Sequence, residues 1–478
     1  MRRNSAACLP PHAAMKDTAM HSTEKSATNL ATTLEDHLNA EMERSKIPGL
    51  GVAIVRDGQV LHIGGYGLAD VEHNVPASSD SIFHSGSTGK MFTAAAVLLL
   101  VQQGRLKLDD PVRRYLIETP ESWAAMTIRQ LLTMMSGLGN FGDAFAPAPI
   151  EGNVVPLNLW QDHNDAQLLA LASLSPLAFA PGESYRYSNT SYIVASLIVA
   201  RVSGKPYYTL LREQLFAPAG MASARDASWS DIVPNRSAGY SRENGELRNR
   251  LWTAPTLLRT GDGGLFFSPR DIARWFIELD RPQVFRPDIV AKMFEPALMR
   301  DGRPAINGYA LGWQNSDVRG QRKIRHGGTW YGFRTELARF PAQNLSVAVL
   351  ANVDDAQVAR IAQQIAGIVD AALAPYEPIA DATPDRTKAD DGLVRMIAAR
   401  QAPRDAFTDE AWQLWNDHWL EQVIVESESD LGPAPLELVD DDGRGQRRYR
   451  LPTGRYHMHW TVDRQADGCV SAMRFHME

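Results

Sequence analysis

The chain of 478 residues has 44% hydrophobic and 22% charged residues, which is ordinary for a globular protein of two or three domains. Its net charge of −7 comes from interspersed acids and bases without an arginine-rich tract, which argues against nucleic acid as a partner. The longest apolar run, residues 94–101, is too short to cross a membrane, and two cysteines cannot build a disulfide framework.

The N-terminus begins like an export signal, with Arg2 and Arg3. Prolines and charged residues then interrupt the apolar stretch that such a signal needs. We therefore expect no signal peptide, a disordered leader over residues 1–28, and a cytoplasmic rather than a periplasmic location. A true start at Met15 or Met20 is the alternative explanation of this segment.

Elements of regular structure are predicted from the end of this leader onward. An apolar residue recurs at every fourth position, at Leu30, Leu34, Leu38 and Met42. This spacing predicts an amphipathic helix that ends before Pro48. Residues 50–70 should form two strands joined by a turn at Asp57-Gly58, and the nearly apolar segment 88–103 predicts a buried helix.

The middle of the chain, about residues 111–313, mixes short helical segments with loops rich in Pro, Gly and Asn. A second hairpin should then form from residues 335–340 and 345–352, followed by a helix over 357–373. This order predicts an α+β fold, in which helices flank one central antiparallel sheet and a large helical insertion interrupts it.

Composition changes again near the C-terminus. Residues 375–391 are rich in Pro, Ala, Asp and Thr and are expected to be a linker after a main domain of residues 29–374. Beyond the linker, residues 392–478 should form a small α+β accessory domain. It would contain a helix near 409–423 and two strands joined by the turn DRQADG.

The stretch HSGSTGKMF, residues 84–92, is compatible with three catalytic motifs. A phosphate-binding loop is excluded, because His84 occupies the place of its first glycine and Met91 that of its hydroxyl residue. A nucleophile elbow is weak, because Ser85 replaces a required glycine. The third interpretation is a Ser-x-x-Lys motif, and both residues that this motif requires are present.

Ser87 and Lys90 are three positions apart at the start of a predicted helix, so both side chains should lie on nearly one face. A buried lysine can accept the serine proton, because desolvation disfavours its charged form. The N–H groups at the start of the helix can support a developing oxyanion. The simpler interpretation is a capping serine and a solvated lysine, but the following helix is too apolar to be solvated.

Two further motifs could complete such a site. Tyr187 and Asn189 offer a phenol and an amide just before an apolar helix, and an ordinary loop with an aromatic anchor is the alternative. His326, Gly327 and Gly328 stand on the strand that opens the second hairpin, where small residues let a substrate approach the strand edge. A tight turn with a surface histidine is the alternative there.

Taken in order, these motifs resemble the penicillin-recognising serine hydrolases of the class C β-lactamase, D-aminopeptidase, D-Ala-D-Ala carboxypeptidase and carboxylesterase type. The resemblance covers roughly residues 34–373. It implies a β-lactamase-like fold. The matching stretches are PGLGVAIVRDGQ, GYGLAD, residues 87–100, GRLKLDDPVRRYL, TIRQLLTMMSGL, PGESYRYSNTSYIVASLIV, GDGGLFFSPRDIARW, GYALGW and HGGTWYGFRTELARFP.

The resemblance also implies roles for individual residues. Ser87 matches the acylated nucleophile of the family, and Lys90 matches the neighbouring base. Tyr187 matches the tyrosine that relays protons to the leaving group and activates the deacylating water. Asn189 matches the amide that holds the acyl-side carbonyl of the substrate.

The family's strand motif falls on His326 and Gly328, and the resemblance implies an oxyanion hole made of the backbone N–H groups of Ser87 and Thr329. Typical class C β-lactamases have lysine at the first position of this motif, and a permanent cation suits the β-lactam carboxylate. A histidine is largely neutral at pH 7, which favours an esterase or peptidase. The sequence also departs from the usual family pattern at residues 134–137, and this difference should affect packing more than chemistry.

Two other groups of residues are weaker candidates for a functional role. His457 and His459 share one face of a predicted strand, but no third ligand is evident, so no metal site is expected. Trp412, Trp415 and Trp419 recur at helical spacing and are expected to pack the core of the small domain or dock it on the large one.

The leading functional hypothesis is a serine hydrolase that cleaves an ester, an amide or a D-amino acid peptide through an acyl-enzyme, with weak β-lactamase activity as a side reaction. No metal or organic cofactor, nucleic acid or membrane is expected to take part. A non-catalytic binder of peptidoglycan fragments or D-peptides is the alternative. The accessory domain is expected to cover the cleft, limit substrate size or mediate assembly into a homodimer.

Overall fold

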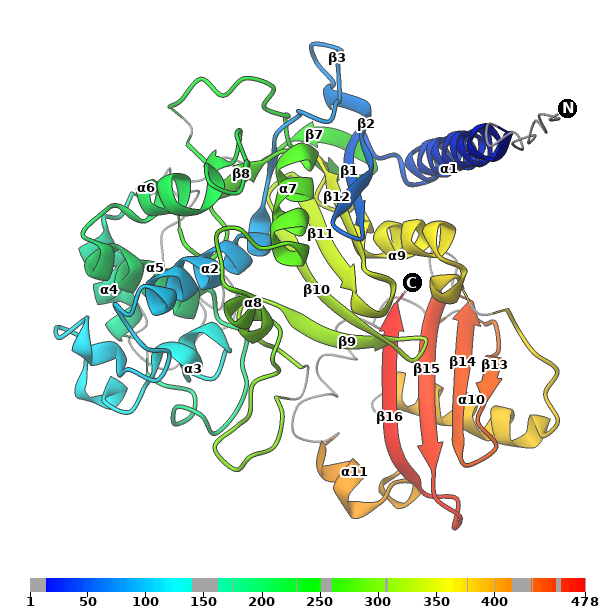
Figure 1. Ribbon diagram of the computed structural model, residues 1–478. Coiled ribbons are helices and arrows are strands. Elements are labelled where there is room, and N and C mark those ends of the chain that lie inside the picture. Colours follow the sequence, from blue (N-terminus) through cyan, green and yellow to red (C-terminus); the bar gives the residue numbers. More distant parts are fainter. Residues whose placement is uncertain are drawn as a thin grey trace, which may run out of the picture. The chain divides into compact units, whose positions relative to one another are not determined.

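The chain divides into two compact units, residues 1–370 and 371–478, and each is described here by itself (Figure 1). The computed structural model describes residues 14–139, 162–174, 176–228, 230–250, 260–305, 308–375, 377–399, 401–414, 431, 433–452 and 457–477. No helix within these ranges is both long enough and apolar enough to cross a membrane.

A seven-stranded antiparallel sheet forms the centre of the first unit (Figure 1). Its strands, in spatial order, are β3 (Val75–Pro76), β2 (Gln59–Asp70), β1 (Gly49–Arg56), β12 (Leu345–Ala351), β11 (Phe333–Phe340), β10 (Gln321–Trp330) and β9 (Gln314–Val318). The N-terminal and C-terminal hairpins meet where β1 pairs with β12, with Leu50 opposite Ala351. Strands from the two ends of this unit's sequence therefore lie side by side in the middle of the sheet.

The two hairpin turns have the residues that their backbone angles require. Asp57 and Gly58, between β1 and β2, both have positive φ angles, of 54° and 66°. These angles belong to the type I′ turn, for which Asp-Gly is a favoured pair. Asn344, which precedes β12, has a φ angle of 47° and is another residue type that tolerates this region.

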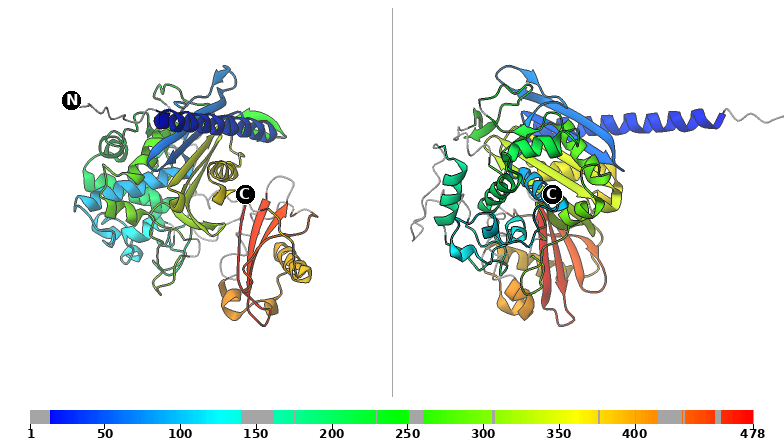
Figure 2. Two further views of the ribbon diagram at one scale, coloured as in Figure 1. Left: turned by 45° about the vertical axis from the view of Figure 1, so that its right-hand side comes forward. Right: turned by 60° about the vertical axis from the view of Figure 1, so that its left-hand side comes forward.

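Helices cover both faces of the sheet, as the further views in Figure 2 also show. On one face, α7 (Pro269–Asp280) begins with a capping box between Ser268 and Asp271 and packs against β1, β2 and β12. On the other, α9 (Val358–Val369) packs against β11 and β12, and α1 (Ala14–Ser45) packs on α9. Every residue of β12 is buried as a result.

The helical insertion surrounds α2 (Gly89–Gln102), whose first twelve residues are all buried. An apolar helix of this kind is stable only inside a core. The other helices of the insertion are α3 (Ile128–Leu132), α4 (Asp165–Leu174), α5 (Asn189–Ser203), α6 (Tyr207–Leu211), a π-helical turn at Arg212–Phe216 and α8 (Pro287–Met293). Short 3-10 turns of the first unit lie at Gly86–Thr88, Val112–Arg114, Glu121–Trp123 and Pro341–Gln343, and those of the second unit lie at Ala371–Leu373 and Arg404–Ala406.

Two small sheets complete the first unit. The strand β8 (Leu265–Phe267) pairs with β4 (Phe83–His84) on one side and with β5 (Arg225–Asp226) on the other. This pairing brings residues 262–267 alongside the turn that carries Ser87. A separate hairpin consists of β6 (Tyr240–Glu243) and β7 (Glu246–Asn249).

The second unit packs α10 (Pro384–Ala398) and α11 (Asp409–Leu414) with a four-stranded antiparallel sheet. Its strands, in order, are β13 (Glu437–Asp441), β14 (Gln446–Pro452), β15 (His457–Arg464) and β16 (Val470–Met477). Asp390 of α10 is fully buried and accepts hydrogen bonds from Tyr449 (2.5 Å) and Arg464 (2.8 Å). Because a buried carboxylate needs such partners, this network holds the helix on the sheet.

The predicted α+β class, with helices on both faces of a central antiparallel sheet, is confirmed, while several boundaries differ. The segment 14–28, expected in a disordered leader, is helical, because residues 13–45 contain neither proline nor glycine. The linker expected over 375–391 is helical from Pro384, which occupies the first helical turn, where proline is tolerated. The helix expected over 357–373 ends at Val369.

In the second unit, the helix expected near 409–423 is present as α11, and residues 415–430 lie outside the part that the structure describes. Trp412 packs against the core of this unit, as predicted, whereas Trp415 and Trp419 fall in the undescribed part. The two predicted C-terminal strands are β15 and β16.

Candidate active site

Ser87 lies in a 3-10 turn, Gly86–Thr88, immediately before α2. Among residues 81–100 it is the one residue that is partly exposed, whereas all the others are buried. Gly86 has a φ angle of 50°, and a Cβ there would lie 2.6 Å from the backbone nitrogen of Thr329. The turn before the serine therefore needs glycine for its conformation and for its contact with β10.

Lys90 is fully buried one turn after Ser87. Its Nζ lies 3.1 Å from Ser87 Oγ, 2.7 Å from Asn189 Oδ1 and 2.7 Å from the backbone oxygen of Asp262. Burial lowers the pKa of Lys90 to about 8, although the charge of Asp262 acts in the opposite direction. An appreciable fraction of this amine is thus neutral near physiological pH and able to accept a proton from Ser87.

Tyr187 and Asn189 come from the start of α5, which Ser188 caps by accepting a hydrogen bond from the backbone N–H of Ser191. The Nζ of Lys90 lies 4.9 Å from the centre of the Tyr187 ring. Burial raises the pKa of the Tyr187 phenol well above its usual value, and its hydrogen bond with Ser87 only partly offsets this. The phenol therefore remains protonated in its resting state and can donate a proton.

The strand β10 passes directly against the Ser87 turn. A Cβ on Gly328 would lie 2.2 Å from the backbone oxygen of Ser85, 2.2 Å from Thr335 Oγ1 and 3.1 Å from the backbone nitrogen of Ser87. Real Cβ atoms do not approach other atoms so closely, so only glycine fits. This approach brings the backbone nitrogens of Ser87 and Thr329 close enough to form a candidate oxyanion hole.

His326 is buried on β10, with its ring centre 6.5 Å from that of Tyr187. Its Nε2 lies 2.9 Å from the hydroxyl of Tyr309, and its Nδ1 lies 2.7 Å from the backbone oxygen of Gly327. The carbonyl must accept, so Nδ1 carries the proton and Nε2 accepts from Tyr309. Burial, together with the charge of Lys90, lowers the pKa of His326 to about 3, so the ring is neutral.

The structure thus brings Ser87, Lys90, Tyr187 and Asn189 together, with Gly328 and Thr329 alongside. His326 shares the neighbourhood, but both of its ring nitrogens have partners within the protein. The loop at residues 134–137 contacts the start of α5, because Met134 Sδ accepts from the Ser188 N–H at 3.3 Å and Ser136 Oγ lies 2.7 Å from Ser191 Oγ.

Sequence reasoning missed Asp262, which lies in the stretch GDGG at residues 261–264. Its backbone oxygen binds Lys90, and its side-chain Oδ1 is buried without a hydrogen-bond partner in the described part of the chain. A Cβ on Gly263 would lie 2.7 Å from the backbone oxygen of Gly86, so this stretch runs against the nucleophile turn. The signal in the sequence that could have identified Asp262 is an acidic residue within a run of three glycines.

The chain was also compared with known proteins. The family model "Beta-lactamase" matches residues 34–369. A D-aminopeptidase of Gluconobacter oxydans is 30% identical over 356 residues, which are 73% of this chain and 64% of that protein. The chain therefore spans less than two thirds of the length of this relative.

Two solved structures share the fold. A D-amino acid amidase from Ochrobactrum anthropi SV3 has a TM-score of 0.58 at 22% identity, covering 72% of this chain and 97% of the other. An octameric penicillin-binding protein homologue from Pyrococcus abyssi has a TM-score of 0.61 at 19% identity, covering 94% of this chain and 100% of the other. With the family match over residues 34–369, these findings show that the chain belongs to the Beta-lactamase family, as the sequence motifs predicted.

Proposed function

We propose that this protein hydrolyses ester or amide bonds through an acyl-enzyme on Ser87. The observation that carries the proposal is the contact of 3.1 Å between Ser87 Oγ and the buried amine of Lys90. In the neutral form, Lys90 takes the serine proton while Oγ attacks the substrate carbonyl carbon. The N–H groups of Ser87 and Thr329 then stabilise the negative charge on the carbonyl oxygen.

Tyr187 protonates the leaving group in this scheme, which fits a phenol that stays protonated because burial raises its pKa well above the usual value. The proton is replaced from the Lys90 ammonium, which lies on the face of the same ring. Water then attacks the acyl-enzyme with the same groups acting in reverse, and the free acid leaves. The amide of Asn189 is placed to hold the acyl-side carbonyl of the substrate.

For the substrate, we propose small esters and amides of D-amino acids rather than β-lactams. The relatives named D-aminopeptidase and D-amino acid amidase support this class. The neutral His326 supports it too, because Tyr309 and Gly327 occupy both of its ring nitrogens. A β-lactam carboxylate would gain no charge-assisted bond there.

An activity screen tests the proposal. D-alaninamide, L-alaninamide, p-nitrophenyl acetate and nitrocefin are offered in parallel to the wild-type protein and to Ser87→Ala. We expect turnover of the ester and of the D-amide, slow or absent turnover of nitrocefin, and loss of all activity in the variant. Tight binding of a D-peptide without turnover or acyl-enzyme would instead support a non-catalytic binder.

A further inference from the structure

The backbone of residues 261–263 runs along the start of α2. Its three successive carbonyl oxygens each accept a hydrogen bond from a different side chain close to Ser87. The donors, in the order of these carbonyls, are Thr93 Oγ1, Lys90 Nζ and Ser85 Oγ. All three side chains belong to residues that are completely buried. Three residues from the nucleophile's own segment therefore hold one short stretch of backbone.

The chemistry of the groups fixes the direction of the first of these hydrogen bonds. A carbonyl oxygen can only accept, so the Thr93 hydroxyl donates to the oxygen of Gly261. Thr93 Oγ1 must then accept from the hydroxyl of Tyr207, which lies 2.5 Å away. Burial raises the pKa of Tyr207, so this phenol keeps the proton that it donates. A chain of two hydrogen bonds thus ties α6, α2 and the 261–263 backbone together.

Ser85 holds the other end of the segment in the same way. Its hydroxyl donates to the oxygen of Gly263 and accepts from the backbone N–H of Leu265 at 3.2 Å. Its own backbone N–H donates to the oxygen of Leu265 at 2.8 Å. A Cβ on Gly261 would lie 2.3 Å from Ser196 Cβ, so α5 confines the segment from another side. The middle carbonyl of the segment therefore lies between two fixed neighbours.

This middle carbonyl directs the amine of Lys90. A neutral amine has two N–H donors and one lone pair. The side-chain oxygen of Asn189 and the backbone oxygen of Asp262, each 2.7 Å from Nζ, can only accept, so they take both N–H donors. The lone pair is left for the third neighbour, Ser87 Oγ at 3.1 Å. A shift of the Asp262 carbonyl would turn the lone pair away from the serine.

We infer that the hydroxyls of Thr93 and Ser85 hold the 261–263 backbone in place, and that its middle carbonyl in turn orients the lone pair of the base towards the nucleophile. The inference rests on the proposed function, in which Lys90 is that base. Thr93 and Ser85 are then positioning residues, because they act through the backbone of another segment. A hydroxyl that only stabilised the fold would leave the base unchanged.

The pH dependence of Ser87 labelling separates these two roles. The second-order rate of fluorophosphonate labelling follows the neutral form of Lys90, and it is measured from pH 6 to pH 10 together with the Tm of each variant. Every variant retains the titratable side chains that face Lys90, which are Asp262, Tyr187, Tyr192 and His326. A change in the midpoint therefore reports a change in how Lys90 itself is held.

Thr93→Val keeps the size and branching of the side chain and removes its hydroxyl. We expect its maximal labelling rate to fall about tenfold or more, because the lone pair is no longer aligned with Ser87. The midpoint should move to lower pH by about half a unit or more, because the Lys90 ammonium loses a hydrogen bond that favours the charged form. Ser85→Ala should cause both effects from the other end of the segment.

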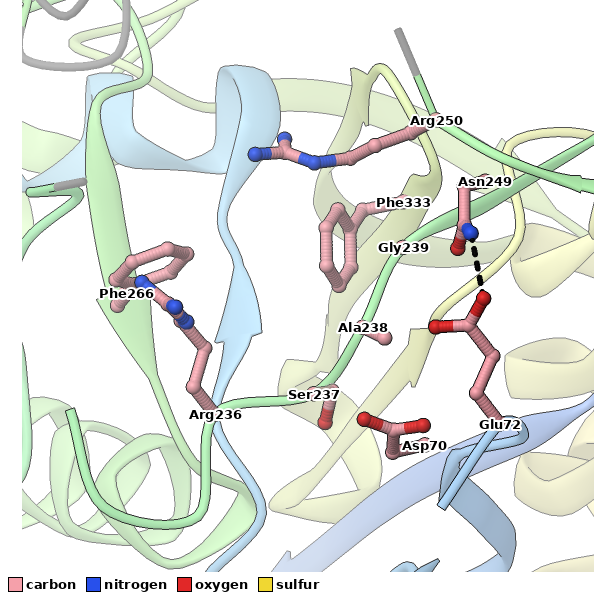
Figure 3. Close-up of a pocket in the computed structure, with 10 residues that line it drawn as sticks. All are labelled: Asp70, Glu72, Arg236, Ser237, Ala238, Gly239, Asn249, Arg250, Phe266 and Phe333. Carbon is pink, nitrogen blue, oxygen red and sulfur yellow. Dashed lines mark hydrogen bonds between the residues drawn. The ribbon is translucent and has the colours of Figure 1, made fainter. Parts of the chain in front are cut away.

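Two further variants serve as controls. Thr93→Ser restores the hydroxyl and should label within about twofold of wild type. Ser237→Ala removes another buried hydroxyl, which has no hydrogen-bond partner in the described part of the chain. Ser237 lines a separate cavity of about 340 Å³, which Figure 3 shows and which neither Thr93 nor Ser87 lines. Its removal should leave both the rate and the midpoint as in wild type.

The possible results are distinct. If the wild type is not labelled, the proposed function fails, and this inference fails with it. If the wild type is labelled and Thr93→Val and Ser85→Ala share its rate and midpoint, the inference alone is overturned. A lower rate that accompanies a lower Tm, with an unmoved midpoint and no restoration by Thr93→Ser, would also overturn it. Tyr207→Phe, which removes one oxygen, replaces Thr93→Val if that variant does not fold, and its midpoint should move in the same direction.

Discussion

The pKa of Lys90 determines how fast Ser87 should react at each pH. Burial lowers the pKa of Lys90 to about 8, so this lysine loses its proton at a lower pH than an exposed lysine does. Only the neutral amine can accept the serine proton. The neutral fraction is about 1% at pH 6 and about one half at pH 8, so the rate should rise roughly 50-fold over this interval and level off above about pH 9. His326, whose pKa is lowered to about 3, adds no titration in this range.

Asp262→Asn isolates the cause of this titration. The carboxylate of Asp262 raises the pKa of Lys90 against the larger effect of burial, whereas its backbone oxygen, which binds Nζ, is retained in the variant. Removal of the charge should therefore lower the pKa of Lys90 further and move the midpoint of the profile to lower pH. Asp288→Asn, on the surface of α8, changes the net charge equally and should leave the midpoint in place.

The assay is the second-order rate of labelling by a fluorophosphonate, which reports the reactivity of the serine alone and excludes later steps. A rate that is constant from pH 6 to pH 9 would refute Lys90 as the base. A midpoint that is the same in Asp262→Asn and in Asp288→Asn would refute the electrostatic role of Asp262.

Three further predictions follow from the geometry. Gly328→Ala places a Cβ 2.2 Å from the backbone oxygen of Ser85, so β10 must move and labelling of Ser87 should slow about 100-fold or more; wild-type labelling would contradict the oxyanion assignment. Tyr187→Phe should lower kcat for an amide about 100-fold without changing Tm, and an unchanged kcat would exclude it as the proton donor. A chain that ends at Asp370 should keep Ser87 labelling, because its unit has its own core, but should differ in substrate turnover or hydrodynamic size. Identical turnover and size would exclude a role for the second unit.

Local patterns made the fold and the nucleophile predictable. Few residue pairs tolerate the positive φ angles of a type I′ turn, so the Asp57-Gly58 pair indicates a hairpin without any knowledge of the tertiary structure. The three-residue spacing of Ser87 and Lys90 lets the start of one helix place both groups on one face, and they lie 3.1 Å apart.

Contacts between distant segments were not predictable in the same way. Asp262 is 172 positions from Lys90 and contributes a backbone oxygen, which any residue type could supply. Its place depends on the pairing of β8 with β4, a contact between two very short strands. The hydrogen bond between Tyr207 and Thr93 likewise joins residues that are 114 positions apart, and no local pattern predicts it.

The central claim is that Ser87 becomes covalently acylated, and one measurement addresses it directly. The protein is mixed with a p-nitrophenyl ester, quenched in acid and measured by intact-protein and peptide mass spectrometry, with Ser87→Ala treated in parallel. We expect one acyl group per chain, located on the peptide that contains Ser87, and none on the variant. An acyl group on another residue, or equal acylation of Ser87→Ala, would contradict the account.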